Sequence, residues 1–266
     1  INENGLGIEL GERIRSVSVN ATTDKRQIGK TDLAIIFVKS TQTGNAARIA
    51  SEFMANNGFV LTLQNGMGNA DIIGEVIDPG QIIAGTTSHG ATMLGPGSIR
   101  HAGTGPTVIG MWSGIQKTGI QKIVDAFNKA GIITETVDDV RSVIWSKLLV
   151  NVGINAITAL TGIKNGRILD FSPTKALSSA AVEEAMEIAR ALGVKVADNT
   201  VDHVFQVAEA TSANRSSMGQ DVDNKRQTEI SAINGAVVKE AQKLGINVPV
   251  NQTLTALIET LQAYYE

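Results

Sequence analysis

The chain has 266 residues, of which 42% are hydrophobic, 18% charged and 4% aromatic. Its net charge is −3 and it has no long basic run, so nucleic acid is not an expected partner. It contains no cysteine, which excludes disulfides, thiolate metal sites and cysteine nucleophiles. The three histidines lie far apart in the sequence, so no metal site is expected.

Apolar runs such as residues 33–38 have the length of a strand and are too short to span a bilayer. No signal peptide is recognisable at the start of the chain. We therefore expect a soluble cytoplasmic protein with no membrane partner.

Short apolar runs alternate with helical patterns over the first half of the chain. Alternation of this kind predicts an α/β layer with a mostly parallel sheet. The predicted strands are residues 33–38, 59–63, 81–86, 98–101, 107–111 and 132–137, and the predicted helices are 41–57, a helix from residue 70, and 114–130.

The pattern changes after residue 138, and the rest of the chain shows no convincing strand. Gly245 is a good helix stop, and Pro249 follows it as helix ends prefer. We place a domain boundary here, giving an α/β domain over 1–138 and an all-helical domain over 139–266. The predicted helices of the second domain are 140–161, 173–192, 198–209, 224–244 and 251–264, with a polar interruption at 214–221.

The helix predicted over 140–161 carries an unusual polar stripe. Lys147, Asn151 and Asn155 are spaced four residues apart, so they fall along one face of an otherwise apolar helix. A buried lysine is costly unless it is paired or faces a cleft, and burial can tune it for proton transfer. The alternative interpretation is a snorkelling surface lysine with two buried asparagines that cap backbone groups.

A second polar segment runs over residues 214–221 and is followed by Glu229. It favours an ordinary structural role when taken alone. Ser217 or Asp221 could begin the helix predicted at 224, and Glu229 could lie on a solvated face.

Two further polar segments directly follow predicted strands. Lys39 follows the strand over 33–38, and residues 64–68, with Asn65, follow the strand over 59–63. Ligands of open α/β sheets bind outside the carboxyl ends of strands, so both segments lie where a ligand is expected. Gly66 and Gly68 would allow the backbone to approach a cofactor closely.

Together these segments resemble the ketopantoate reductase (2-dehydropantoate 2-reductase) family, over essentially the whole chain and in that family's order. The combination of the Lys–Asn–Asn helix with Asn-Arg-Ser-Ser-Met and Thr-Glu-Ile is specific to it. The matching stretches are residues 32–39, 64–68, 95–103, 145–155, 165–166, 214–221 and 228–230.

The resemblance implies a Rossmann-type domain followed by a helical domain, and reduction of ketopantoate to pantoate in pantothenate and coenzyme A biosynthesis. It implies NADP as cofactor, with NAD as the alternative, a small 2-keto acid as substrate, and a homodimer as one expected assembly. By resemblance, Lys147 is the catalytic proton donor and Glu229, placed on a helix, is the second catalytic residue. Substrate-binding residues would be Asn151, Asn155, Asn165, Asn214 and Ser217, and cofactor-side residues Lys39 and Asn65. We expect their polar groups to converge on a cleft between the two domains.

One part of the family pattern has no match in this sequence. The family begins with a strand, a Gly-x-Gly-x-x-Gly turn and a helix that binds pyrophosphate. Gly5-Leu-Gly7 does not fit this turn and resembles the hairpin after the second strand. We therefore expect a Rossmann-type domain that lacks its first βαβ segment and has little activity alone. The alternatives are a related dehydrogenase acting on another 2-keto acid, and a non-catalytic remnant.

Overall fold

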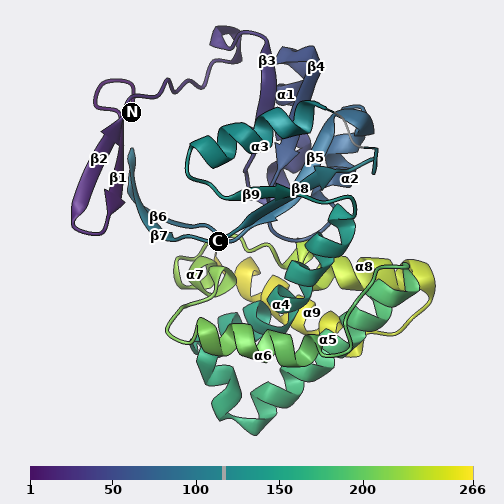
Figure 1. Cartoon of the computed structure of the whole chain (residues 1–266). Coiled ribbons are helices and arrows are strands. Elements are labelled where there is room, and N and C mark those ends of the chain that lie inside the picture. The colour runs from purple at the N-terminus through teal and green to yellow at the C-terminus, as the bar shows by residue number, and fades with distance from the viewer. Residues whose placement is uncertain (116–117, 266) are drawn as a thin grey trace. The chain divides into compact units, whose positions relative to one another are not determined.

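The computed structural model describes residues 1–115 and 118–265, which divide into two compact units (Figure 1). The first unit comprises Ile1–Phe37, Gly44–Leu63 and Gly74–Val140. The second comprises Val38–Thr43, Gln64–Ile73 and Arg141–Glu266. The second unit therefore contains the two segments that follow the strands predicted at 33–38 and 59–63.

A five-stranded sheet forms the centre of the first unit, in the order β3-β4-β5-β8-β9. Every neighbouring pair is parallel except β5 and β8, which are antiparallel. The predicted α/β layer with a mostly parallel sheet is thus confirmed. The strands are β3 (Thr31–Ile36), β4 (Met54–Thr62), β5 (Ile82–Thr87), β8 (Thr107–Met111) and β9 (Thr134–Thr136).

The central strands are buried on both faces. Consecutive residues Val60 and Leu61 of β4 are fully buried, as are Ile82 and Ile83 of β5. Side chains alternate between the faces of a strand, so both faces must be covered. Helix α3 (Gly119–Lys129) packs its apolar side into the cluster that contains Leu61 and Ile83. Helix α1 (Thr43–Phe53) buries two alanines.

A second, four-stranded sheet has the order β2-β1-β7-β6. Its strands are β1 (Leu6–Leu10), β2 (Arg13–Val17), β6 (Gly90–Gly95) and β7 (Ser98–Gly103). The hairpin of β1 and β2 agrees with the interpretation of the first residues as a hairpin. Strand β6 was not predicted, and its centre is largely exposed, with Met93 at 71%. A strand with little burial has no alternating pattern to recognise.

Several boundaries in the first unit differ from those predicted. The helix predicted over 41–57 ends at Phe53, and β4 begins at Met54 rather than at residue 59. The helix predicted over 114–130 begins at Gly119, and residues 116–117 of that prediction lie outside the described residues.

The second unit is helical, and its described part contains no strand from Arg141 onward. Its core comes from all the long helices, with α4 at the centre contributing Leu148, Val152 and Ile157. Gly245 ends α8 in the left-handed conformation, as predicted. The helices are α4 (Val140–Thr161), α5 (Ser172–Ala191), α6 (Thr200–Ala210), α7 (Ser217–Asp223), α8 (Asn234–Leu244) and α9 (Pro249–Ala263). Short 3-10 turns occupy Lys25–Gln27, Ser40–Gln42, Pro79–Gln81, Asn165–Asp170 and Ile230–Ala232.

Helix α4 is, among the described residues, the one helix long and apolar enough to cross a membrane by length and composition. The search of the sequence for continuous apolar runs did not identify this helix as a possible membrane span, because polar residues interrupt its apolar runs. Its most hydrophobic window is 61% buried within the fold, as is typical of a core helix. We therefore interpret its apolarity as core packing.

The helix predicted over 224–244 is wrong in its first half. Helix α7 begins inside the predicted polar interruption and is capped by Ser216, whose hydroxyl accepts a hydrogen bond from the Gly219 amide. The chain then leaves the helical conformation at Lys225, which has a φ of 50°. The next α-helix, α8, begins only at Asn234.

A carboxylate of α5 holds the start of α9. Glu184 accepts hydrogen bonds from the amides of Val250 and Asn251, at 2.9 Å each, and from the side-chain amide of Asn251 at 2.8 Å. The first amides of a helix have no partner within the helix. A negative charge beside them also interacts favourably with the positive end of the helix dipole. Glu184 therefore acts as an N-terminal cap supplied by a neighbouring helix.

We predict that Glu184→Ala lowers the unfolding free energy of the helical unit by about 2–3 kcal/mol, because charged hydrogen bonds to buried donors are lost. Urea denaturation followed by circular dichroism measures this. Glu183→Ala, at the adjacent exposed position, is the control and should change stability by less than about 0.5 kcal/mol. Equal effects of the two substitutions would contradict the capping role.

Candidate active site

All nine residues selected from the sequence lie in the second unit. Lys147, Asn151 and Asn155 are on α4, as predicted from their spacing. The others lie on the segments after β3 and β4, on the turn that starts at residue 165, around the start of α7, and just before the turn that starts at residue 230; they are Lys39, Asn65, Asn165, Asn214, Ser217 and Glu229.

The polar stripe of α4 is partly or fully buried. Lys147 and Asn151 are partly buried, and Asn155 is 5% exposed. Burial lowers the pKa of Lys147 below its ordinary 10.5, because the charged form loses hydration, and the negative charge of Glu229 opposes this by raising the pKa. Lys147 is therefore a better proton donor than a lysine in water.

Glu229 is a buried carboxylate with partners from another segment. Its Oε1 atom accepts a hydrogen bond from the Ser40 amide at 3.3 Å, and its Oε2 atom lies 3.9 Å from Lys39 Nζ. Glu229 does not lie on a helix, contrary to the prediction; it precedes the 3-10 turn at Ile230–Ala232. The preceding Thr228 holds this position by donating its amide and hydroxyl to Gln262 of α9.

The shortest ion pair here joins Lys39 to Asp221, with 2.6 Å between Nζ and Oδ2. The Asp221 carboxylate is largely buried, whereas 46% of the Lys39 side chain is exposed. Asp221 belongs to a motif that the sequence singled out, but no pattern linked it to Lys39, 182 residues away. Lys39, Asp221, Glu229 and Lys147 thus form a group of two lysines and two carboxylates.

The asparagines are linked through backbone and hydroxyl groups rather than directly. The Asn165 amide donates to the Asn214 carbonyl at 3.0 Å, and the Asn165 side chain donates to the Thr211 hydroxyl at 3.0 Å. The buried Asn165 Oδ1 atom has no partner in the described part of the chain. Asn155 is tied in through its carbonyl, which accepts from the Thr158 hydroxyl.

The remaining three predicted residues are not joined to these by hydrogen bonds. Within residues 1–115 and 118–265, Asn65, Asn151 and Ser217 make no side-chain hydrogen bond to another member of the predicted set. Asn214 and Ser217 are exposed. Convergence on a cleft between domains remains a prediction.

The glycines after β4 have different surroundings. Gly66 and Gly68 both adopt the left-handed conformation, with φ of 82° and 85°. A Cβ atom on Gly66 would lie 2.3 Å from the Ala232 carbonyl oxygen, whereas one on Gly68 would meet nothing within 4 Å. Gly66 is therefore required by close packing against the chain itself, which the Met67 amide reinforces by donating to Ala232 at 2.8 Å.

The group of four charges suits acid–base chemistry on a small polar molecule. A lysine with lowered proton affinity can donate a proton to an oxygen on which negative charge develops. Neutral amides nearby can orient polar groups of a ligand without adding charge. The same residues include no histidine or cysteine, so they do not form a common transition-metal site.

Comparison with known proteins gives a consistent result. A family model described as ketopantoate reductase PanE/ApbA matches residues 1–114, and one for the C-terminal part of that family matches 139–262. The chain is 37% identical to a 2-dehydropantoate 2-reductase of Halobacterium salinarum, covering 98% of this chain and 86% of that protein. It is 35% identical to one from Pyrococcus abyssi, covering 99% and 86%. A crystal structure of a PanE/ApbA family ketopantoate reductase from Ralstonia eutropha is similar with a TM-score of 0.91 at 32% identity, covering 99% and 86%.

We predict that Gly66→Ala lowers the unfolding free energy by about 2–4 kcal/mol, because it adds both backbone strain and a clash with Ala232. Gly68→Ala is the matched control, since it has the same strain with open space around it. It should cost only about 1–2 kcal/mol. Urea denaturation measures both; equal losses would show that contact with Ala232 is unimportant.

Proposed function

The chain belongs to the ketopantoate reductase family, and we propose that it reduces 2-dehydropantoate to pantoate with a nicotinamide cofactor. The name shared by relatives from Halobacterium and Pyrococcus supports this substrate. The observation that carries the proposal is the partly buried Lys147, whose pKa is raised by the charge of the buried Glu229 and lowered by burial. It supplies the proton donor that reduction of a ketone to an alcohol requires.

The two parts of the chain have different proposed roles. Residues 1–138 form the cofactor-binding domain, which the mostly parallel five-stranded sheet supports. Residues 139–266 form the domain that binds substrate and carries Lys147 and Glu229. We propose NADP as the cofactor, with NAD as the alternative.

The residues after β3 and β4 fit the nicotinamide end of such a cofactor. They lie at the carboxyl ends of parallel strands, and the buried Ser40 Oγ atom there has no hydrogen-bond partner in the part of the chain that the structure describes. A ligand with polar groups would satisfy it. Lys39 and Asn65 would hold the cofactor, which when bound supplies hydride to the ketone carbon.

Lys147 donates its proton to the ketone oxygen as that carbon is reduced. The ammonium also stabilises negative charge on the oxygen before the proton moves. The charge of Glu229 raises the pKa of Lys147 and so counteracts part of the larger, opposite effect of burial. Solvent then returns a proton to Lys147 after the alcohol leaves.

The substrate is held by neutral groups in this proposal. Asn151 and Asn155 extend from Lys147 along α4, while Asn165 and Asn214 come from turns and Ser217 is the first residue of α7. The unpartnered Asn165 Oδ1 atom is suited to accept a hydrogen bond from a substrate hydroxyl.

We predict that Lys147→Ala lowers kcat for 2-dehydropantoate by about 10²–10⁴-fold, the usual loss for a positioned acid. Cofactor affinity should change far less, because the interaction is made mainly in the transition state. Steady-state kinetics and cofactor titration measure the two effects. Ser146→Ala, one residue away on the exposed side of α4, is the control.

Near-normal turnover of Lys147→Ala would show that the lysine is structural. A panel of other 2-keto acids run on the unaltered enzyme separates the substrate assignment from the mechanism. If another 2-keto acid has a higher kcat/KM than 2-dehydropantoate, the substrate assignment fails while the role of Lys147 stands.

We also predict a shift in the alkaline limb of the pH profile. The protonated form of Lys147 is the active one, so kcat/KM falls as pH rises through its pKa, which burial sets below 10.5. Glu229→Gln removes the charge that raises this pKa, so the midpoint should move to lower pH. Asp170→Asn, in an exposed ion pair with Arg167, is the control and should leave the midpoint unchanged. An unmoved or higher midpoint in Glu229→Gln would refute the coupling.

A further inference from the structure

Two proposed substrate residues lie at exposed positions between α6 and α7: Asn214 is in the turn and Ser217 is the first residue of α7. Asn214 and Ser217 flank Arg215 and Ser216, and fixing such a backbone costs about 1–2 kcal/mol per residue in conformational entropy. A substrate bound by this turn therefore benefits if the turn is already ordered. Ser216 supplies one anchor, because its hydroxyl accepts from Thr158 of α4 at 2.7 Å.

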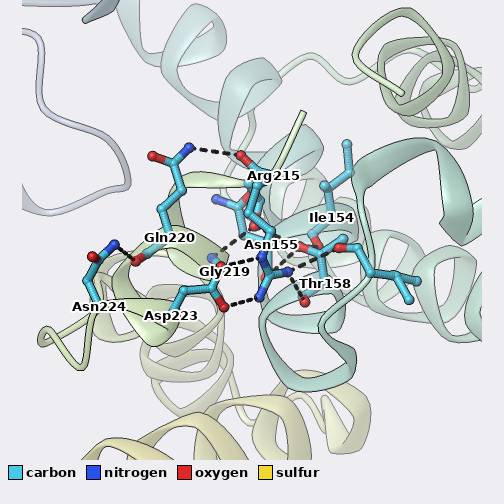
Figure 2. Close-up of polar contacts among 10 residues, drawn as sticks. Ile154, Asn155, Thr158, Arg215, Gly219, Gln220, Asp223 and Asn224 are labelled. Carbon is cyan, nitrogen blue, oxygen red and sulfur yellow. Dashed lines mark hydrogen bonds and ion pairs between the residues drawn. The ribbon is translucent and has the colours of Figure 1, made fainter. Parts of the chain in front are cut away.

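Arg215 supplies the larger anchor and makes four hydrogen bonds within the second unit (Figure 2). Its Nε and Nη2 atoms donate to the two oxygens of Asp223, at 2.8 and 2.9 Å, in a bidentate pair. Its Nη1 atom donates to the backbone carbonyls of Thr158 and Ile163. The Arg215 side chain is only 17% exposed.

These contacts join the end of one helix to another. Thr158 lies in the last turn of α4, at the negative end of the helix dipole, and its carbonyl also accepts a hydrogen bond from the Gly162 amide at 3.0 Å. Asp223 is the last residue of α7. One guanidinium, on a residue of the turn that carries Asn214, thus ties the helix that carries Lys147 to the end of α7.

Gly219 packs directly against this guanidinium. A Cβ atom on Gly219 would lie 2.6 Å from both Cζ and Nη1 of Arg215. Gly219 sits in the middle of α7, where alanine would ordinarily stabilise a helix by about 1 kcal/mol. Glycine at this position leaves room for the arginine contacts.

We propose that Arg215 is a positioning residue that holds Asn214 and Ser217 in the arrangement that binds the 2-keto acid. The inference rests on the proposed function, since it assumes that this turn contacts the substrate. Lysine cannot replace the arginine, because one ammonium cannot bind the Asp223 carboxylate in a fork and reach the α4 carbonyls together.

The test is a set of variants in the whole enzyme, assayed with 2-dehydropantoate. If Arg215→Lys reduces the ordered fraction of the turn to about a tenth, the KM for 2-dehydropantoate rises about tenfold. The values of kcat and of the cofactor KM should stay within about twofold, because Lys147 is untouched. Gly219→Ala should reproduce the effect by displacing the guanidinium, whereas Asp223→Glu, which keeps the fork, should leave the KM close to that of the unaltered enzyme.

Arg190→Lys is the matched control, because Arg190 pairs with Asp198 over the same sequence separation and the same 2.8 Å distance. It should leave every kinetic constant unchanged. Hydrogen exchange of residues 211–217 provides a readout that needs no substrate. It should accelerate in Arg215→Lys and in Gly219→Ala but not in Arg190→Lys.

The outcomes separate this proposal from the proposed function. A fall in Tm with an unchanged KM for 2-dehydropantoate and unchanged exchange in 211–217 overturns the positioning role. If Arg215→Lys does not fold, Gly219→Ala decides by the same two readouts. If the unaltered enzyme does not reduce 2-dehydropantoate, the proposed function fails, and hydrogen exchange alone then decides whether Arg215 orders the turn.

Discussion

A buried carboxylate must be compensated, and Glu229 brings distant parts of the chain together for this reason. Its charge is met by the Ser40 amide, by Lys39 and by Lys147, which come from the segment after β3 and from α4. Leaving such a group uncompensated would lower the free energy of unfolding by about 3–5 kcal/mol. The chemistry of the second unit thus depends on the same interactions that make Glu229 tolerable in its interior.

The parts of the fold that could be predicted were those whose burial follows a simple period. The bounds of α4 were correct, because helix-forming apolar residues dominate its whole length and the polar residues Lys147, Asn151 and Asn155 repeat every four positions. The break between α7 and α8 was not predictable from that pattern. Its conformation depends on Lys225 in a left-handed geometry and on Gln262 of α9, which accepts hydrogen bonds from Thr228 although it lies 34 residues away in the sequence.

The sequence predicted which residues belong to the candidate site better than it predicted the contacts between them. Local spacing and resemblance selected Lys147, Glu229 and the asparagines, and all of them lie in one unit. The pairing of Lys39 with Asp221 and the anchoring by Arg215 rest on contacts between segments that are separate in sequence. A sequence without aligned relatives carries no signal for such pairs. The nearby Gly66 shows the same limit, since the partner that excludes a side chain there is Ala232.

The stripe on α4 also determines how this protein can change in evolution. Lys147, Asn151, Asn155 and Thr158 share a helix face only because each is three or four residues from the next. A one-residue deletion within this stretch would rotate every later member by about 100° relative to Lys147, a consequence of 3.6 residues per turn. Point substitutions along the stripe alter one contact at a time, whereas insertions and deletions there scramble the whole set. Length variation among descendants of this sequence should therefore accumulate in turns such as 193–199 and spare the interior of α4.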